Sequence, residues 1–387
     1  MSDYLLFLFP IAVITILMWG AKLQRKDEYY EDAWSVAQSK SLQAVAALMI
    51  ILHHTVQSIT GYGSIWKGPV TMWNSFGYLF TSIFFFFSGF GLYKSYKTKE
   101  HYLDGFLKNR LPKILIPFMV ANILYLIFAS QGRVNEIRYV ITSIFGFTLL
   151  NRNAWFVVEL IFLYLAFYIC MKKSSTEHAA LIKLTVFTLI LVTFSLLLGH
   201  DRSAISGHWF MGEWWYNSTL TFIMGFFVAK NEEKTKSIMM KGYKILLPAS
   251  VLALWGWFLL EESVLRRFGY YKEWVNHPGY PEKFYTLIMQ VILCFIFMFF
   301  ILLVNLKIEF KNHVLDFLGG ISFEIFLIHD IFRWQFLKCV ENGMPDALYL
   351  GLTFGFSVVA GWIFAKVNKY ILGKRYFIQS WNRGKIN

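Results

Sequence analysis

Residues 41–58 read SLQAVAALMIILHHTVQS, an apolar run that ends with two adjacent histidines, His53 and His54. The core of a lipid bilayer is about 30 Å thick, and roughly 20 apolar residues of α-helix cross it. An ionisable side chain at that depth is costly unless it faces other protein groups. The stretch therefore predicts a membrane-spanning helix that carries a polar site near one end.

Apolar segments of similar length recur along the whole chain of 387 residues, of which 57% are hydrophobic and only 16% are charged. The mean hydropathy is +0.48, which is typical of an integral membrane protein. We predict an all-α integral membrane protein with about eleven transmembrane helices. The predicted spans are Tyr4–Gly20, Ser41–Ser58, Phe76–Tyr93, Leu111–Ser130, Ala154–Met171, Ala180–Leu198, Trp214–Ala229, Ile245–Leu260, Phe284–Val304, Val314–Phe332 and Ala347–Ala365.

Two apolar segments differ from the rest. Residues 137–150 are too short to cross easily, and we interpret them as a re-entrant or interfacial segment. The first span, Tyr4–Gly20, has no basic residue before it, has Asp3 beside it and lacks a small-residue cleavage site. It is therefore predicted to be a retained helix rather than a signal peptide.

Lys and Arg residues set the predicted orientation, because they collect in the cytoplasmic loops of membrane proteins. Most of the 37 cations lie in alternate loops, which predicts a multi-pass cell-membrane protein with its amino terminus outside and its carboxyl terminus in the cytoplasm. The net charge of +13 then reflects this anchoring, and no nucleic-acid partner is expected. The predicted cytoplasmic segments are Lys22–Lys40, Lys94–Lys113, Lys172–Lys183, Lys230–Lys244, Lys307–Lys311 and Lys366–Lys385.

The cysteines Cys170, Cys294 and Cys339 lie far apart, in or beside apolar runs. They predict neither a disulfide framework nor a metal site. The chain also has no glycine-rich phosphate loop and no tandem repeat. We therefore expect no permanently bound cofactor.

Few ionisable or polar side chains lie within the predicted spans, and each is a candidate for function. A helical rise of about 1.5 Å per residue places His54 about 21 Å from the inner edge at Lys40, and His329 about 22 Å beyond Val314. Glu159 lies about 8 Å below the outer edge. This convergence in the outer third of the membrane predicts a functional site. The full set is His53, His54, Glu159, Glu324 and His329, with Gln43 and Ser88.

A histidine near a helix end is also a common structural residue, and this alternative is stronger for His53 than for His54. Adjacent helical residues point about 100° apart, so only one of the pair can face a shared pocket. For Glu324, a structural role and a chemical role both remain open.

Five motifs interrupt the apolar runs between about Lys40 and Lys369, and read SLQAVAALMIILHHT, FFFFSGFGLY, FLKNRLPKILIP, NAWFVVELIFLYLAFYI and LGGISFEIFLIHDIF in chain order. Their types and their order resemble the acyltransferase-3 family, multi-spanning membrane acyltransferases that modify surface glycans. The resemblance aligns His54 with the histidine of the family's first core helix and His329 with its late histidine.

The same resemblance places Arg110 and Lys113 on the family's Arg-x-x-Arg pair. It implies a ten-helix core at residues 40–370, preceded by an extra transmembrane helix and cytoplasmic loop at 1–39 and followed by a cytoplasmic tail at 371–387. The chain departs from the family pattern at several positions. Gln43 and Lys113 stand where the family has arginine, and Phe323 and Phe326 stand where it has tyrosine.

Transfer of an acyl group from a thioester to a hydroxyl needs a base, and an imidazole can serve. We predict that His54 is this base, and that Glu159 or His329 orients its ring or helps to move the proton.

The predicted donor is cytosolic acyl-CoA, whose phosphates need cations at the inner surface. Arg110 and Lys113 lie three residues apart, hence on one face if the helix has begun, and Ser88 lies on the path toward the interior. Lys40, one turn before Gln43, is expected to replace the missing arginine.

The leading hypothesis is an acetyl or other short-chain acyltransferase acting on a hydroxyl of a lipid-linked or surface saccharide. The alternative is a proton-coupled secondary transporter or lipid-carrier flippase, because buried His and Glu also suit proton coupling. Against it, the chain has no inverted repeat and no paired Gly/Pro-broken helices. The sequence leaves the oligomeric state open.

Overall fold

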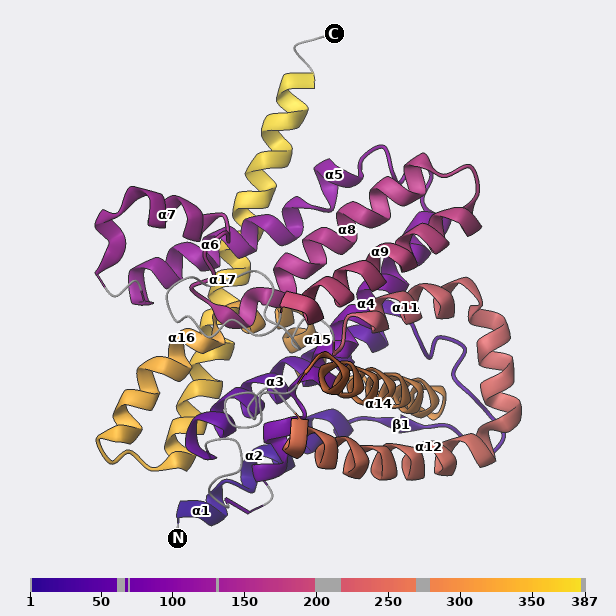
Figure 1. Cartoon of the computed structure of the whole chain (residues 1–387), viewed down its shortest axis with the longest axis horizontal. Coiled ribbons are helices and arrows are strands. Elements are labelled where there is room, and N and C mark those ends of the chain that lie inside the picture. Colours follow the sequence, from indigo (N-terminus) through magenta and orange to yellow (C-terminus); the bar gives the residue numbers. More distant parts are fainter. Residues whose placement is uncertain are drawn as a thin grey trace.

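The computed structural model describes residues 2–60, 67–68, 70–129, 132–198, 217–268 and 279–383, and these are almost entirely helical (Figure 1). Within this part of the chain, seven helices are long and apolar enough to cross a membrane. The all-α membrane class is therefore confirmed, whereas the predicted number of about eleven spans is not. The seven are Val36–Thr60, Phe106–Phe128, Arg152–Lys173, Glu177–Leu197, Glu232–Phe268, Tyr280–Lys307 and Asp346–Gly373.

The elements follow one another along the chain with short connections. They are α1 (Ser2–Leu5), α2 (Leu8–Met18), β1 (Lys22–Leu23), α3 (Val36–Thr60), η1 (Val70–Ser75), α4 (Gly77–Thr98), α5 (Phe106–Asn109), α6 (Pro112–Ala129), η2 (Arg133–Asn135), α7 (Ile137–Ile144), η3 (Arg152–Ala154), α8 (Trp155–Lys173), α9 (Glu177–Leu198), α11 (Leu220–Lys230), α12 (Glu232–Phe268), α14 (Tyr280–Lys307), β2 (Ile308–Glu309), α15 (His313–Gly320), α16 (Ser322–Glu341) and α17 (Asp346–Arg383).

The first predicted span, Tyr4–Gly20, is two helices rather than one, because α1 ends at Leu5 and α2 begins at Leu8. Pro10 explains the break. A proline has no N–H to bond the carbonyl four residues earlier, which here is that of Leu6, and its ring would clash with that carbonyl.

The predicted span Val314–Phe332 is also broken, between α15 and α16 at Ile321. Gly319 and Gly320 precede the break, and glycine is a poor helix former. Gly319 also has a packing role, because a Cβ at this position would lie 2.5 Å from the Lys40 carbonyl oxygen of α3. The depth of His329 was inferred along one straight helix from Val314, and this assumption was wrong.

The segment at residues 137–150 contains only the eight-residue helix α7, which is too short to cross a bilayer. It lies at the edge of the molecule in Figure 1, and its apolar side chains Ile137 and Ile141 are exposed. Its re-entrant or interfacial position stays a prediction.

Two glycines bring α4 and α11 into direct backbone contact. A methyl group on Gly89 would collide with the Phe222 carbonyl, and one on Gly225 would collide with the Phe86 carbonyl. Small residues permit such close crossings inside membranes. Residues 214–216, at the start of the predicted span Trp214–Ala229, lie outside the described residues.

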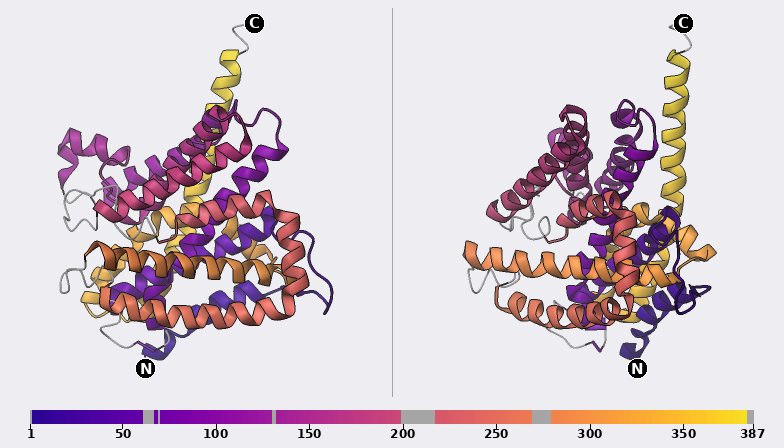
Figure 2. Two further views of the ribbon diagram at one scale, coloured as in Figure 1. Left: turned by 45° about the vertical axis from the view of Figure 1, so that its right-hand side comes forward. Right: turned by 90° about the vertical axis from the view of Figure 1, so that its right-hand side faces the viewer.

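Helix α12, which has 37 residues, bends along its course and then runs beside α14 (Figure 2). Pro248 lies inside α12, and an internal proline is a usual cause of a kink. Helix α17 continues beyond the body of the molecule to Arg383, so most of the predicted tail at 371–387 is helical (Figure 2).

Contacts between loops place several predicted cytoplasmic segments at one end of the molecule. Lys94 pairs with Glu232 (2.7 Å) and Lys97 with Glu177 (2.9 Å), while Lys230 lies 3.5 Å from the same Glu177. Strands β1 and β2 pair antiparallel and join two further segments. These contacts support the alternation of loops, and the side that faces the cytoplasm stays a prediction.

Lys307 connects the amino-terminal segment to the end of α14. Its side chain is almost fully buried, and Nζ donates to the carbonyl oxygens of Arg25 (2.7 Å), Lys26 (2.9 Å) and Glu28 (2.6 Å). Nζ also lies 4.2 Å from the centroid of the Tyr29 ring. Lys307 therefore holds two segments of the protein together. The sequence-based interpretation had treated it, like the other loop cations, as a membrane anchor.

Candidate active site

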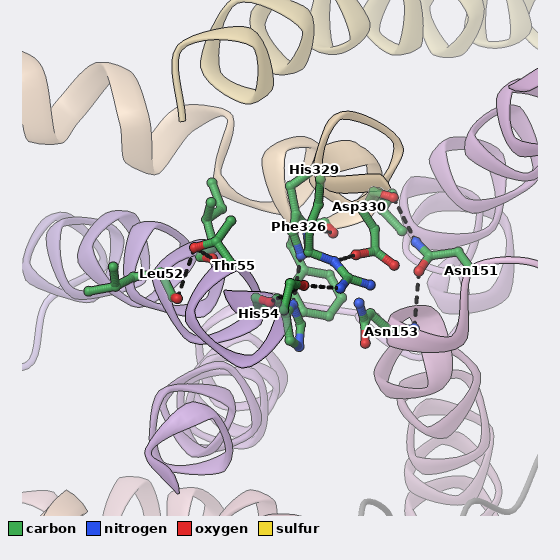
Figure 3. Close-up of polar contacts among 12 residues, drawn as sticks. Leu52, His54, Thr55, Asn151, Asn153, Phe326, His329 and Asp330 are labelled. Carbon is green, nitrogen blue, oxygen red and sulfur yellow. Dashed lines mark hydrogen bonds and ion pairs between the residues drawn. The ribbon is translucent and has the colours of Figure 1, made fainter. Parts of the chain in front are cut away.

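The two candidate histidines of α3 and α16 meet in the interior. Nδ1 of His54 lies 2.8 Å from Nε2 of His329, and the two ring planes are nearly parallel, at 4° (Figure 3). His329 is fully buried, whereas His54 is half-buried. His329 and Glu159 were the two residues predicted from the sequence to orient His54, and His329 contacts it.

The hydrogen bonds determine which nitrogen carries each proton. Nδ1 of His329 lies 2.7 Å from the Phe326 carbonyl oxygen, which can only accept, so this nitrogen carries hydrogen. In a neutral ring the other nitrogen, Nε2, is then an acceptor, and Nδ1 of His54 must donate to it. With both rings neutral, Nε2 of His54 is left with its lone pair, and it has no hydrogen-bond partner among the described residues.

His53 has a different environment, in which both ring nitrogens are occupied. Nδ1 lies 2.8 Å from the Trp73 carbonyl oxygen, and Nε2 lies 3.0 Å from Nε2 of Gln57. A Cβ at Gly77 would collide with the His53 ring, so the absence of a side chain there makes room for it. These contacts support the structural alternative for His53.

A buried ion pair lies beside the histidines and was missing from the sequence-based set. Asp330, 1% exposed, accepts from Nε of Arg333, and Nη1 of the same guanidinium lies 2.7 Å from the Ser58 hydroxyl. Asp330 falls within the predicted span Val314–Phe332. A carboxylate at that depth, three residues before an arginine, is a pattern that would have identified the pair.

Asn151 joins the start of α8 to α16 next to Asp330 (Figure 3). Its Nδ2 donates to the Leu327 carbonyl at 2.8 Å, and its Oδ1 accepts from the backbone N–H of Asn153 at 3.0 Å. Asn151 is almost fully buried, and Asn153 is half-buried. Neither asparagine was predicted, since both lie just outside the predicted span that begins at Ala154.

Glu159 does not join the histidine pair. It is fully buried on α8, where Oε1 accepts a hydrogen bond from the Thr219 hydroxyl. Its other oxygen has no hydrogen-bond partner in the described part of the chain. Of the two residues predicted to orient His54, the structure brings only His329 into contact with it.

The predicted donor cations do not share a helical face. Arg110 follows the last residue of α5, and α6 begins at Pro112, so the helix has not begun at Arg110. Arg110 is half-buried, with Nη2 3.4 Å from the Tyr164 hydroxyl, whereas Lys113 is exposed. The two residues remain close, because the Lys113 N–H donates to the Arg110 carbonyl at 3.2 Å.

Lys40, Gln43 and His54 lie on the one continuous helix α3, as predicted. Lys40 is exposed and Gln43 is half-buried, as is Ser88 on α4. Glu324 accepts from Nδ2 of Asn368 at 3.4 Å, which supports a structural role. Among the described residues, no cluster of His, Cys, Asp and Glu could hold a metal ion.

Residues 38–366 match the family model described as an acyltransferase domain, that of acyltransferase-3. The match spans most of the chain and contains every motif on which the resemblance was based. Searches of curated proteins and of solved structures found no match. The chain therefore belongs to the acyltransferase-3 family of membrane acyltransferases.

Proposed function

We propose that the protein transfers an acetyl or other short acyl group from cytosolic acyl-CoA to a hydroxyl of a cell-surface or lipid-linked saccharide. The observation that supports this most directly is the pairing of His54 with His329 inside a family of acyltransferases. The pair leaves an unprotonated nitrogen on a half-buried imidazole, which is the group that hydroxyl activation requires.

In the proposed reaction, Nε2 of His54 takes the proton of the acceptor hydroxyl as its oxygen attacks the thioester carbonyl carbon. The new C–O bond forms and the C–S bond breaks. The imidazolium of His54 then returns the proton to the leaving thiolate of CoA. Atoms and charge balance without a metal or a redox partner.

His329 would act on His54 as the third member of a hydrolase triad acts on its histidine. Its Nε2 accepts from Nδ1 of His54, and so it orients the ring and stabilises the imidazolium that forms. Phe326 in turn fixes His329 through its backbone carbonyl. The proposed chain of hydrogen bonds runs from the Phe326 carbonyl through His329 and His54 to the acceptor hydroxyl.

For the donor, Arg110 and Lys113 are the proposed phosphate contacts, because charge-assisted hydrogen bonds to phosphate suit both cations. Nε of Arg110 has no hydrogen-bond partner among the described residues although it is buried. Lys40, Gln43 and Ser88 are proposed to line the route of the donor between the inner surface and His54.

The rival proposal of a proton-coupled transporter or flippase gains no specific support. Family membership favours acyl transfer. The buried carboxylate of Glu159 bonds Thr219 instead of the histidines, so it does not extend a proton path from them.

The test uses membrane vesicles from cells that express the full chain, supplied with radiolabelled acetyl-CoA. Label should enter the carbohydrate fraction of the envelope, and free CoA thiol should appear at the same rate. His54→Ala vesicles with equal protein content are the control and should transfer nothing. Label that enters at the same rate in both preparations would overturn the proposal.

A further inference from the structure

The contact between α3 and α16 is repeated one helical turn beyond the histidines. Ser58 follows His54 by four residues and Arg333 follows His329 by four, so each lies on the same face as its histidine. Nη1 of Arg333 lies 2.7 Å from the Ser58 hydroxyl. The two helices are therefore joined by two successive polar contacts.

Ser58 is also tied back to the residue that carries the proposed chemistry. Its hydroxyl donates to the His54 carbonyl oxygen at 3.1 Å. The Ser58 oxygen thus accepts from Arg333 and donates to the backbone of His54. A displacement of the guanidinium is transmitted to His54 through a single side chain.

Asp330 holds the other edge of the guanidinium. It lies next to His329 in the sequence, is almost fully buried, and accepts from Nε of Arg333. An unpaired charge at this depth would be costly, so the carboxylate makes the cation tolerable there. With Nε and Nη1 occupied, the planar fork of Arg333 has one orientation.

We infer that Arg333 is a positioning residue for the His54–His329 pair, acting through Ser58. This inference rests on the proposed role of His54 as the base. The Asp330–Arg333–Ser58 bridge fixes the rotation and the register of α16 against α3, so that Nδ1 of His54 meets Nε2 of His329.

The physical reason lies in how little misplacement a proton transfer tolerates. A shift of about 1 Å in a reacting group can cost about 100-fold in rate. Two helices joined only by one histidine contact can rotate about it. A second contact one turn away removes that freedom.

The test measures kcat and KM for hydrolysis of acetyl-CoA by the purified full chain, in which water takes the place of the acceptor hydroxyl and CoA thiol is released, with thermal melting of each variant. Ser58→Ala removes the bridge and keeps the ion pair, so kcat should fall about 10-fold, while KM and the melting temperature change little. Ser58→Thr retains a hydroxyl and should restore most of the rate.

A second variant distinguishes the positioning of the histidine pair from the cost of leaving a buried charge unpaired. Arg333→Met alone leaves Asp330 unpaired and is expected to fold poorly, so it is combined with Asp330→Asn. The double variant should recover its melting temperature yet keep a loss of about 100-fold in kcat. Lys338→Met removes an exposed cation from the same helix and should behave like the parent protein.

Parental kcat in both Ser58→Ala and the double variant, with His54→Ala inactive, would overturn the positioning role and leave the proposed function intact. Activity retained in His54→Ala would instead overturn the proposed function on which the inference rests.

Discussion

Nδ1 of His54 lies 2.8 Å from Nε2 of His329, although 275 residues separate them in the chain. The contact joins the first long helix to one of the last, and both histidines lie within the family match at residues 38–366. Because the Phe326 carbonyl fixes the proton on His329, the direction of this bond is also determined when both rings are neutral. The predictions below follow from this geometry and from the contacts around it.

The two adjacent histidines should differ sharply when each is replaced by alanine. His54→Ala should abolish transfer from acetyl-CoA, because it removes the proposed base. His53→Ala should keep most of the activity and lower the melting temperature, because it leaves Gln57 and the Trp73 carbonyl unpaired. The reverse ranking would assign the base to His53.

Glu159 should be dispensable for the chemical step. Glu159→Gln keeps an oxygen that can accept from Thr219, so the variant should fold and retain most of its transfer rate. Radiolabel transfer in vesicles measures this directly, with His329→Ala compared alongside. A loss as large as that of His329→Ala would return Glu159 to the set of catalytic residues.

Arg110 should contribute more to donor binding than Lys113. Losing a charge-assisted phosphate contact costs about 1.5 to 3 kcal/mol, or roughly 10- to 150-fold in affinity. Arg110→Ala should approach the upper figure because Arg110 is half-buried against Tyr164, and Lys113→Ala should lie near the lower one because Lys113 is exposed.

Calorimetric titration of the purified chain with acetyl-CoA gives these affinities. Lys108→Ala, which removes an exposed cation from α5, is the matched control and should bind like the parent protein. Parental affinity in both Arg110→Ala and Lys113→Ala would reduce the pair to membrane anchors.

Lys40 should compensate for the arginine that Gln43 replaces. Both residues lie on α3, one turn apart, so either can place a cation on the same helical face. Lys40→Ala should lose transfer activity, and Gln43→Arg in that background should recover part of it. Full transfer by Lys40→Ala at normal expression would rule this compensation out.

Lys307 should stabilise the fold. Lys307→Met leaves three carbonyl oxygens without their donor, and a hydrogen bond to a charged group contributes about 1.5 to 3 kcal/mol. Thermal unfolding in detergent should therefore begin at a clearly lower temperature. Lys311→Met, which removes an exposed cation just beyond β2, should melt like the parent protein; equal melting of the two variants would contradict the structural role.

The helices could be predicted because their causes are local. A backbone in lipid must satisfy its own hydrogen bonds, and an unbroken apolar run as long as residues 41–58 has the length of a spanning helix. The cost of burying ionisable groups in lipid likewise marks His54 and His329 as candidates from their positions in the chain, together with His53, Glu159 and Glu324. The family follows from the same motifs.

Both helix breaks have local causes in the sequence. Pro10 divides the first predicted span, and Gly319 with Gly320 precedes the division of Val314–Phe332. The predicted shared face of Arg110 and Lys113 failed for a related reason. A spacing of three residues implies a shared face only within a continuous helix, and Arg110 lies just outside α5.

Partners across helices could not be read from the chain, because the crossing of two helices depends on packing between residues that are distant in sequence. Sequence spacing alone could not tell Glu159 from His329 as the neighbour of His54. What distinguishes Glu159 from His329 is the hydrogen bond that Glu159 accepts from the Thr219 hydroxyl, sixty residues away in the chain. This bond exists only once α8 and α11 have packed. The Arg333–Ser58 bridge has the same origin: each residue is ordinary in its own helix, and the contact forms only when α16 lies against α3.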